Sequence, residues 1–235
     1  MPKRIGFVLT LGLVAAGCAS TKPSSGAGPF EPPSLTPLQD HARFSSKITH
    51  PYLPLSTTRY AEFGSEDAKV VRAVLDETRE VGGVQCLVLA EKEVEDGEVA
   101  EISYNFFAQD DQGNVWYFGE DVDDYEDGKI VSHGGSWKVG RNAKEPCLFL
   151  PARLEVGFRF KPENSPPDAE EFDEVAALDA ELKVPAGSYK DVLVVHEGKK
   201  LGVIEERKYY ARGVGLISEN RKVNLLAAPT DGSNR

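Results

Sequence analysis

The chain has 235 residues and carries 38 Asp and Glu against 27 Lys and Arg, which gives a formal net charge of −11. An acidic chain without a basic cluster argues against nucleic acid as a partner, because phosphate contacts need Lys and Arg. It argues equally against docking of the body on anionic lipid. We interpret the acidity as that of a solvated protein surface.

Residues 1–17 have the features of a signal peptide. Lys3 and Arg4 precede an apolar run at residues 5–16, which is too short to cross a bilayer of ~30 Å as a helix. Small residues fill positions 15–17, directly before Cys18. This order resembles the bacterial lipobox, in which the cysteine is diacylated, with chains such as palmitate, and the signal is cut before it. The alternative is an ordinary secretory signal.

We therefore predict that Cys18 is the lipidation site and the mature N-terminus. Acyl chains contribute about 0.8 kcal/mol per buried CH₂, so a multiply acylated cysteine is a stable membrane anchor. Ala19, rather than Asp, follows Cys18. By resemblance to lipoprotein sorting in Gram-negative bacteria, this favours the outer membrane of the cell envelope.

The rest of the chain divides by composition into three parts. Residues 18–47 are rich in Pro, Ser and Gly and are expected to form a lipidated flexible tether. Residues 48–229 are enough for one sizeable core and are predicted to form a single domain. Residues 230–235 are a C-terminal tail.

The domain is predicted to be all-β or β-dominated: a single curved antiparallel sheet, or half-barrel meander, with long loops. Runs of alternating apolar and polar residues are separated by turn clusters of Asp, Asn and Gly, which is the pattern of antiparallel hairpins. Residues 174–184 fit either a helix or a strand, and strand is chosen. Residues 162–173, rich in Pro and Glu, are predicted to be an exposed loop. The predicted strands are residues 57–63, 68–79, 84–94, 100–108, 115–118, 130–139, 153–161, 174–184, 191–197, 203–210 and 215–226.

Large aromatic residues gather in the central strands of this pattern. Their side chains offer much contact area at little cost in rotamer entropy, which suits a binding face. The alternative is that each ring belongs to the hydrophobic core. The candidate ligand or partner face consists of Tyr104, Phe106, Trp116, Phe118 and Trp137.

Two motifs mark the C-terminal part, VPAGSYKDVL at residues 184–193 and YYARGVGLI at residues 209–217. With NVWYFGE at residues 114–120, they resemble motifs of uncharacterised exported bacterial lipoprotein families. The similarity covers most of residues 48–226, and Arg212 stands where those families more often have proline or lysine. The resemblance implies a fold similar to the half-barrels of lipoprotein carriers. It provides no catalytic residues to transfer.

Catalytic motifs are weak in this sequence. Gly134-Gly135-Ser136 approaches a serine nucleophile elbow but lacks the final glycine and the strand-to-helix context. The four histidines, at positions 41, 50, 133 and 196, do not have metal-ligand spacing. The acidic stretch at residues 120–128 is the best metal candidate, but Tyr125 occupies a position where a calcium loop needs Asp or Asn. We expect neither a metal nor a cofactor, and interpret this stretch as a solvated hairpin tip.

Cys86 and Cys147 are the two cysteines that remain besides Cys18. In an oxidising compartment a pair suggests a disulfide. Both lie in apolar runs, so buried free thiols are the alternative.

Two classes of function stay open. The first is a noncatalytic envelope lipoprotein whose curved sheet binds an apolar ligand or a partner protein, and we favour it over an enzyme. The second is a hydrolase of envelope glycan that uses paired carboxylates, which would lie about 5–10 Å apart in a cleft, one of them with a raised pKa.

Overall fold

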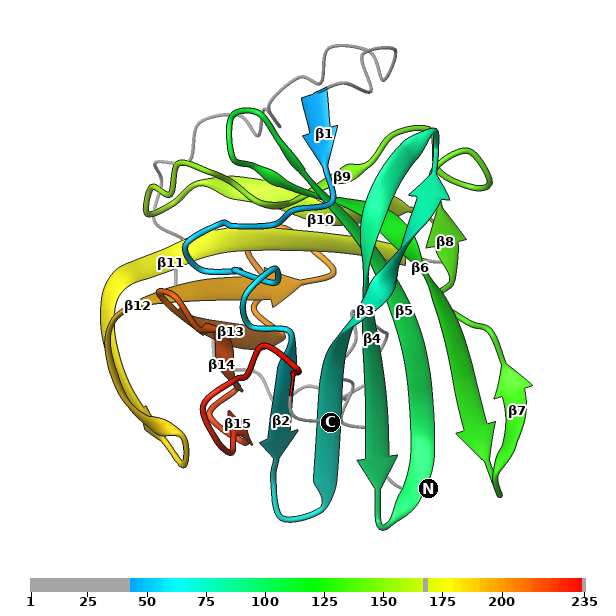
Figure 1. Ribbon diagram of the computed structural model, residues 1–235. Coiled ribbons are helices and arrows are strands. Elements are labelled where there is room, and N and C mark those ends of the chain that lie inside the picture. Colours follow the sequence, from blue (N-terminus) through cyan, green and yellow to red (C-terminus); the bar gives the residue numbers. More distant parts are fainter. Residues whose placement is uncertain (1–42, 167–168, 234–235) are drawn as a thin grey trace.

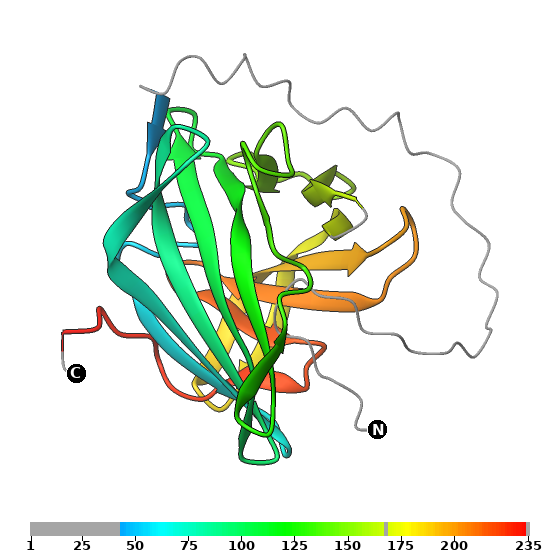
Figure 2. The ribbon, with the colours of Figure 1, turned by 90° about the vertical axis from the view of Figure 1, so that its right-hand side faces the viewer.

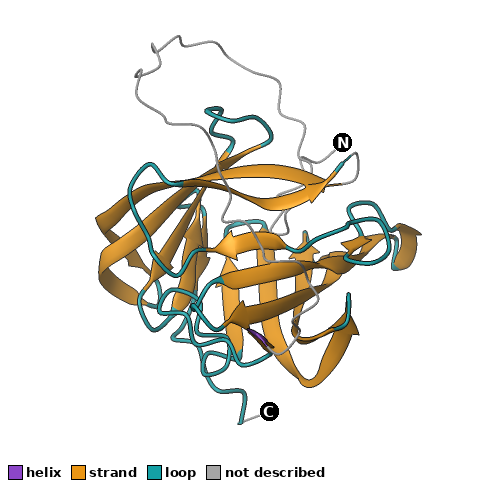
Figure 3. Cartoon of the chain, turned by 90° about the horizontal axis from the view of Figure 1, so that it is seen from above, coloured by secondary structure: helices purple, strands orange, loops and turns teal. Residues whose placement is uncertain are grey.

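Strands of one antiparallel sheet make up most of the molecule (Figure 1). The structure is a computed structural model that describes residues 43–166 and 169–233. In these ranges 65% of the chain is strand and no α-helix occurs. Figure 3 shows the strands, in orange, making up most of the described chain. The predicted fold class, a curved all-β antiparallel sheet, is confirmed, and the sheet is not closed into a barrel. The predicted signal peptide, Cys18 and most of the tether lie outside the described residues.

Strands follow one another as a meander. The strands are β1 (Phe44–Ser45), β2 (Tyr60–Gly64), β3 (Ala68–Val81), β4 (Val84–Glu95), β5 (Glu98–Asp110), β6 (Val115–Glu126), β7 (Lys129–Ser132), β8 (Trp137–Lys138), β9 (Cys147–Leu150), β10 (Arg159–Ser165), β11 (Ala169–Val184), β12 (Gly187–Gly198), β13 (Glu206–Ala211), β14 (Gly215–Glu219) and β15 (Val223–Leu225).

The spatial order is β10-β11-β12-β13-β14-β15-β2-β3-β4-β5-β6-β7. Three short strands lie off this path: β1 pairs with β5, and β8 and β9 pair with β6. Strands β3 to β7 form one wall, and β11 to β14 run across it on the other side of the molecule (Figures 1 and 2). The two ends of the order approach each other, because β10 packs against β9 and β6.

The segment at residues 162–173 is not the exposed loop that its composition predicts. It contains the end of β10 and the start of β11, and Glu163 and Asp173 in it are buried. Pro162 is tolerated because β10 lies at the end of the strand order and its ladder shifts register between Phe160 and Glu163. Residues 174–184 are strand, as chosen.

Two further boundaries differ from those predicted. The predicted strand at residues 130–139 is two short strands, β7 and β8, with a turn at residues 134–135 between them. The predicted strand at residues 153–161 begins only at Arg159. In the other direction, β6 continues unbroken through most of the acidic stretch as far as Glu126, and only residues 127–128 form the hairpin tip.

The sheet has a concave inner face and an outer face. Near β8, side chains on both faces are buried, such as Trp137 on the inner face and Phe106 on the outer face. Trp137 donates a hydrogen bond from its indole N–H to Glu163 Oε1 (3.2 Å), which joins β8 to β10 across the inner face. On the outer face, the ring of Phe106 lies under the charged groups of Arg79 and Lys138. Inner and outer side chains therefore alternate along strands that are buried on both sides.

Cys86 and Cys147 are free, buried thiols. Of the two alternatives for this pair, buried free thiols are therefore correct, and no disulfide joins Cys86 to Cys147. Burial raises the pKa of each thiol to about 12, so both thiols are protonated near neutral pH and are poor nucleophiles.

Over the described ranges, no helix has the length and apolar character that a membrane crossing would need.

Candidate functional site

The five aromatic residues predicted as a binding face do not share one exposed face. Four of the five rings, those of Phe106, Trp116, Phe118 and Trp137, are at most 4% exposed. Only Tyr104 is open to solvent, at 37%. Trp137 packs edge-on against Tyr117 on the inner face, whereas Phe106 lies on the outer face. The four buried rings belong to the hydrophobic core.

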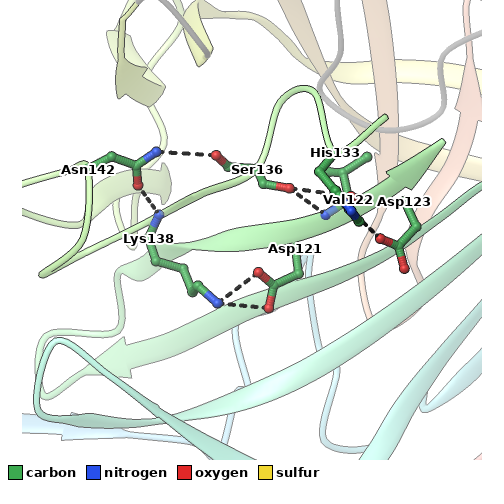
Figure 4. Close-up of polar contacts among 7 residues, drawn as sticks. All are labelled: Asp121, Val122, Asp123, His133, Ser136, Lys138 and Asn142. Carbon is green, nitrogen blue, oxygen red and sulfur yellow. Dashed lines mark hydrogen bonds and ion pairs between the residues drawn. The ribbon is translucent and has the colours of Figure 1, made fainter. Parts of the chain in front are cut away.

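The region around Ser136, whose motif was judged weak from the sequence, has no catalytic geometry (Figure 4). The Ser136 hydroxyl accepts a hydrogen bond from the backbone N–H of Val122 at 2.9 Å, and no contact joins it to His133. His133 Nδ1 lies 2.7 Å from Asp123 Oδ1, and its side chain is 70% exposed. Asp121 pairs with Lys138 at 2.7 Å. These contacts therefore hold β8, and the turn that precedes it, against β6.

The inner face carries a feature that the sequence analysis missed: buried and half-buried acids from eight strands. We call this set the acidic interior. Among the described residues its cationic members are Arg72 on β3 and Lys208 on β13. Its carboxyl residues are Glu91, Glu93, Glu101, Glu120, Glu163, Glu171, Asp173, Glu197, Glu206 and Glu219.

Strand register explains why these side chains meet. Directly paired residues point to the same face of a sheet. Glu163 pairs with Glu171, and Asp173 pairs with Glu197. Glu197 in turn pairs with Glu206, and Lys208 pairs with Glu219. The other wall repeats this pattern, with Arg72 opposite Glu91, Glu93 opposite Glu101, and Asn105 opposite Glu120.

Lys208 is the centre of one half of the acidic interior. Its Nζ lies 2.5 Å from Glu197 Oε2, and both side chains are less than a tenth exposed. Burial acts to raise the pKa of Glu197, but the ammonium of Lys208 outweighs it and the pKa is lowered. Burial likewise acts to lower the pKa of Lys208, but Glu197, Glu171 and Glu219 raise it well above its usual value. The pair is therefore ionised.

The carboxyl groups around this pair behave in the opposite way. Burial raises the pKa of Glu206 to about 8, and it raises the pKa of Glu171, Asp173 and Glu219 well above their usual values. One ammonium cannot neutralise five carboxylates, and buried charge without a partner is unstable. These four groups therefore hold protons near neutral pH unless another cation is present.

A second cluster lies where β6 and β8 meet β10. Burial, followed by the charge of Glu163, raises the pKa of Glu120 well above its usual value. Burial raises the pKa of Glu163 to about 8, against the hydrogen bond from Trp137. The Tyr117 hydroxyl donates a hydrogen bond to Asn105 Oδ1 beside them. Two adjacent acids whose pKa values are both raised can share a proton.

Arg72 and Glu91 form the third polar group of the interior. The Arg72 side chain is 14% exposed and that of Glu91 is 7% exposed, and their charged atoms are in contact. Asn105 Nδ2 donates to Glu91 Oε2 at 3.3 Å. This carboxylate is thus paired, although burial raises its pKa.

Several carboxyl oxygens of the interior have no hydrogen-bond partner. They include Asp173 Oδ1, Glu219 Oε2 and both oxygens of Glu120. A buried polar atom without a partner costs roughly 1–3 kcal/mol, and more if it is charged. Such atoms need a proton, a water molecule or a cation.

A small cavity lies at one end of the inner face, lined by Leu53, Phe63, Arg72, Leu89 and Leu216. Its volume is about 20 Å³, which is room for one water molecule. Sites for drug-sized ligands have about 300–1,000 Å³. This cavity therefore does not hold a lipid-sized molecule.

The sequence does contain a signal for the acidic interior. Residues 87, 89, 91 and 93 alternate in phase, and the first two are Leu and the last two are Glu. A strand whose apolar face continues in phase as carboxylates places acids on the same inner surface. The sequence analysis instead assigned the acidity of the chain as a whole to a solvated surface.

No family model, no curated protein and no solved structure matches this chain.

Proposed function

We propose that this protein is a noncatalytic, lipid-anchored binding protein of the bacterial envelope that takes a small cation into its acidic interior. One observation carries the proposal: ten carboxyl groups share the inner face with two cationic side chains. An enclosed surface with this balance favours positive ligands, because low-dielectric walls strengthen the attraction.

The apolar ligand expected from the aromatic residues has less support. Four of the five predicted rings are buried in packing. The inner face offers carboxylates where a lipid would need an apolar lining. We therefore propose a cationic ligand in place of an apolar one.

A titration distinguishes the two ligand classes. The full chain is titrated separately with calcium chloride, spermidine and palmitate while tryptophan fluorescence is followed, since Trp137 touches Glu163. We expect a saturable response to at least one of the two cationic probes and none to palmitate. A response to palmitate alone would overturn the proposal.

Anchoring is tested separately. In a bacterium that processes lipoproteins, Cys18→Ser should prevent lipidation and move the protein out of the membrane fraction. Membrane association that is unchanged in this variant would contradict the proposed anchor. The motifs at residues 184–193 and 209–217, which resemble those of exported lipoproteins, support the same proposal.

Hydrolysis of envelope glycan remains a second candidate because Glu120 and Glu163 form an adjacent pair of acids. Glu163 has a pKa of about 8, which suits a proton donor near neutral pH. Against this, Glu120 is 0% exposed and Glu163 is 2% exposed, so a glycan would not reach them without a rearrangement of the sheet. Turnover of peptidoglycan that is lost in Glu163→Gln would establish this alternative.

A further inference from the structure

We propose that Glu171, Asp173 and Glu197 bind a divalent cation of the size of calcium. This inference rests on the proposed function and makes it specific, since it names the cation and the atoms that hold it. Each residue contributes one carboxylate oxygen, and these three oxygens all lie within 4.8 Å of one another.

The strands hold the three acids in this position. Asp173 on β11 and Glu197 on β12 are direct cross-strand partners. Glu171 precedes Asp173 by two residues on β11 and therefore points to the same face. Rigid neighbouring strands fix ligand positions better than a loop does.

The ligand chemistry favours calcium over magnesium. Calcium accepts several carboxylate oxygens in a flexible geometry at roughly 2.3–2.6 Å, whereas magnesium demands near-ideal octahedral geometry at roughly 2.0–2.1 Å and usually keeps several waters. Three carboxylate oxygens that all lie within 4.8 Å of one another are close enough to share one such ion.

Oxygens that lack a partner point to the same ligand. Asp173 is 6% exposed and its Oδ1 has no hydrogen-bond partner. Glu219 on β14 is not one of the three proposed ligands. It is 2% exposed, and its Oε2 also lacks a hydrogen-bond partner. Glu219 faces the site because it pairs with Lys208.

Charge balance also favours a divalent ion at this place. The groups that face the three acids are Glu163 on β10, Glu206, Lys208 and Tyr210 on β13, and Glu219 on β14. Among these groups Lys208 is the one base, and it already pairs with Glu197. A divalent ion bound to the three acids supplies the positive charge that one ammonium does not.

Isothermal titration calorimetry tests the inference on the full chain after treatment with EDTA. Calcium chloride and magnesium chloride are titrated separately at pH 8. We expect saturable binding of calcium and weaker binding of magnesium. Absence of saturable calcium binding at pH 8 would overturn the inference, and a spermidine response in the same sample would leave the proposed function standing.

Two variants locate the site. Asp173→Asn keeps the shape of the side chain and should weaken calcium binding by at least about tenfold, a loss seen even for residues that only support a metal ligand. Glu181→Gln is the matched control, because Glu181 lies on the same strand with its side chain 69% exposed, and calcium binding should not change. Equal binding by Asp173→Asn and the unaltered chain would place the ion elsewhere and overturn the inference. If Asp173→Asn loses its β-type circular dichroism, Glu171→Gln takes its place under the same criteria.

Lys208→Met provides an independent readout. The ammonium of Lys208 repels an incoming cation that uses Glu197, so its removal should tighten calcium binding. Weaker calcium binding in a folded Lys208→Met variant would contradict the proposed competition and overturn the site.

Discussion

Arg72 and Lys208 each keep one carboxylate of the inner face in its charged form. Each pair forms across adjacent strands, Arg72 with Glu91 and Lys208 with Glu197, and each is almost fully enclosed. Removal of one partner leaves a buried charge, which is costly, whereas an exposed pair contributes little.

At the scale of the residue, Arg72→Met should therefore destabilise the fold by about 3–5 kcal/mol near neutral pH. Lys190→Met is the control, because Lys190 and Glu181 form a pair whose side chains are 78% and 69% exposed. This control should change the free energy of unfolding by less than about 1 kcal/mol. Urea denaturation followed by circular dichroism measures both, and equal effects would contradict the enclosed pairing.

Gly119 is a position where any side chain is excluded. It lies at a register shift opposite Phe106, with φ of +122°, and an added Cβ would lie 2.1 Å from the carbonyl oxygen of Trp137. Gly119→Ala should therefore cost more than the ~1–3 kcal/mol of backbone strain alone. Gly128→Ala is the control, since Gly128 has φ of +71° but open space around its Cβ. Similar urea midpoints for the two variants would contradict this prediction, because they would show that β8 moves aside to make room for the added Cβ.

At the scale of the element, β8 links the two ends of the sheet although it has only two residues. Trp137 packs edge-on against Tyr117 of β6 and donates to Glu163 of β10. Trp137→Ala removes both contacts and should destabilise the protein by about 3–5 kcal/mol.

Trp137→Phe separates these two contributions. It keeps a ring against Tyr117 but removes the indole donor, which acts to lower the pKa of Glu163. The pKa of Glu163 should therefore rise above about 8 in this variant. Titration of the Glu163 carboxyl carbon by NMR measures the shift, and an unchanged pKa would mean that the hydrogen bond has no electrostatic effect.

The elements themselves were largely predictable from sequence. Apolar and polar alternation located β3, β4, β5 and β12 to within a few residues. It failed at residues 162–173, because a proline and several glutamates look like a loop when the edge position of Pro162 and the inward direction of Glu163 are unknown. Tyr104 lies in phase with Phe106 on β5, but it is 37% exposed whereas Phe106 is 0% exposed.

The acidic interior was not predicted, and the reason is physical. Glutamate in a strand normally faces water, so alternation assigns it to the outside. Only the curvature of the whole sheet brings Glu120 of one wall against Glu163 of the other. Such contacts between distant strands depend on register and closure, which a local pattern does not contain.

At the scale of the whole molecule, stability should depend on pH in an unusual direction. Glu163 and Glu206 have a pKa of about 8 in the folded state against 4.5 when unperturbed. Between these values the folded protein holds protons that the unfolded chain has lost, so stability falls as the pH rises. His50 acts in the opposite direction, because burial lowers its pKa to about 4, but only below pH 6.5.

We therefore expect the protein, in EDTA, to lose stability from pH 6.5 to pH 8, by about 1.4 kcal/mol per pH unit for each extra proton held. Urea titrations at half-unit steps of pH measure this slope. Glu163→Gln should reduce it, since one such group is removed. A free energy of unfolding that increases through this range would contradict the protonated interior.

The strand order also determines when the molecule can be completed during its synthesis. Nearly every strand pairs with its neighbour in sequence, but β2 has β3 on one side and β15 on the other, so that Phe63 lies opposite Leu225. Because β15 follows β2 by about 160 residues, one edge of β2 stays unpaired until this whole stretch is available for folding. Such an edge is a template for pairing with other unfolded chains. The three residues of β15 thus cover an edge that would otherwise favour aggregation, and a chain that stops just before them would be more harmful than their small number suggests.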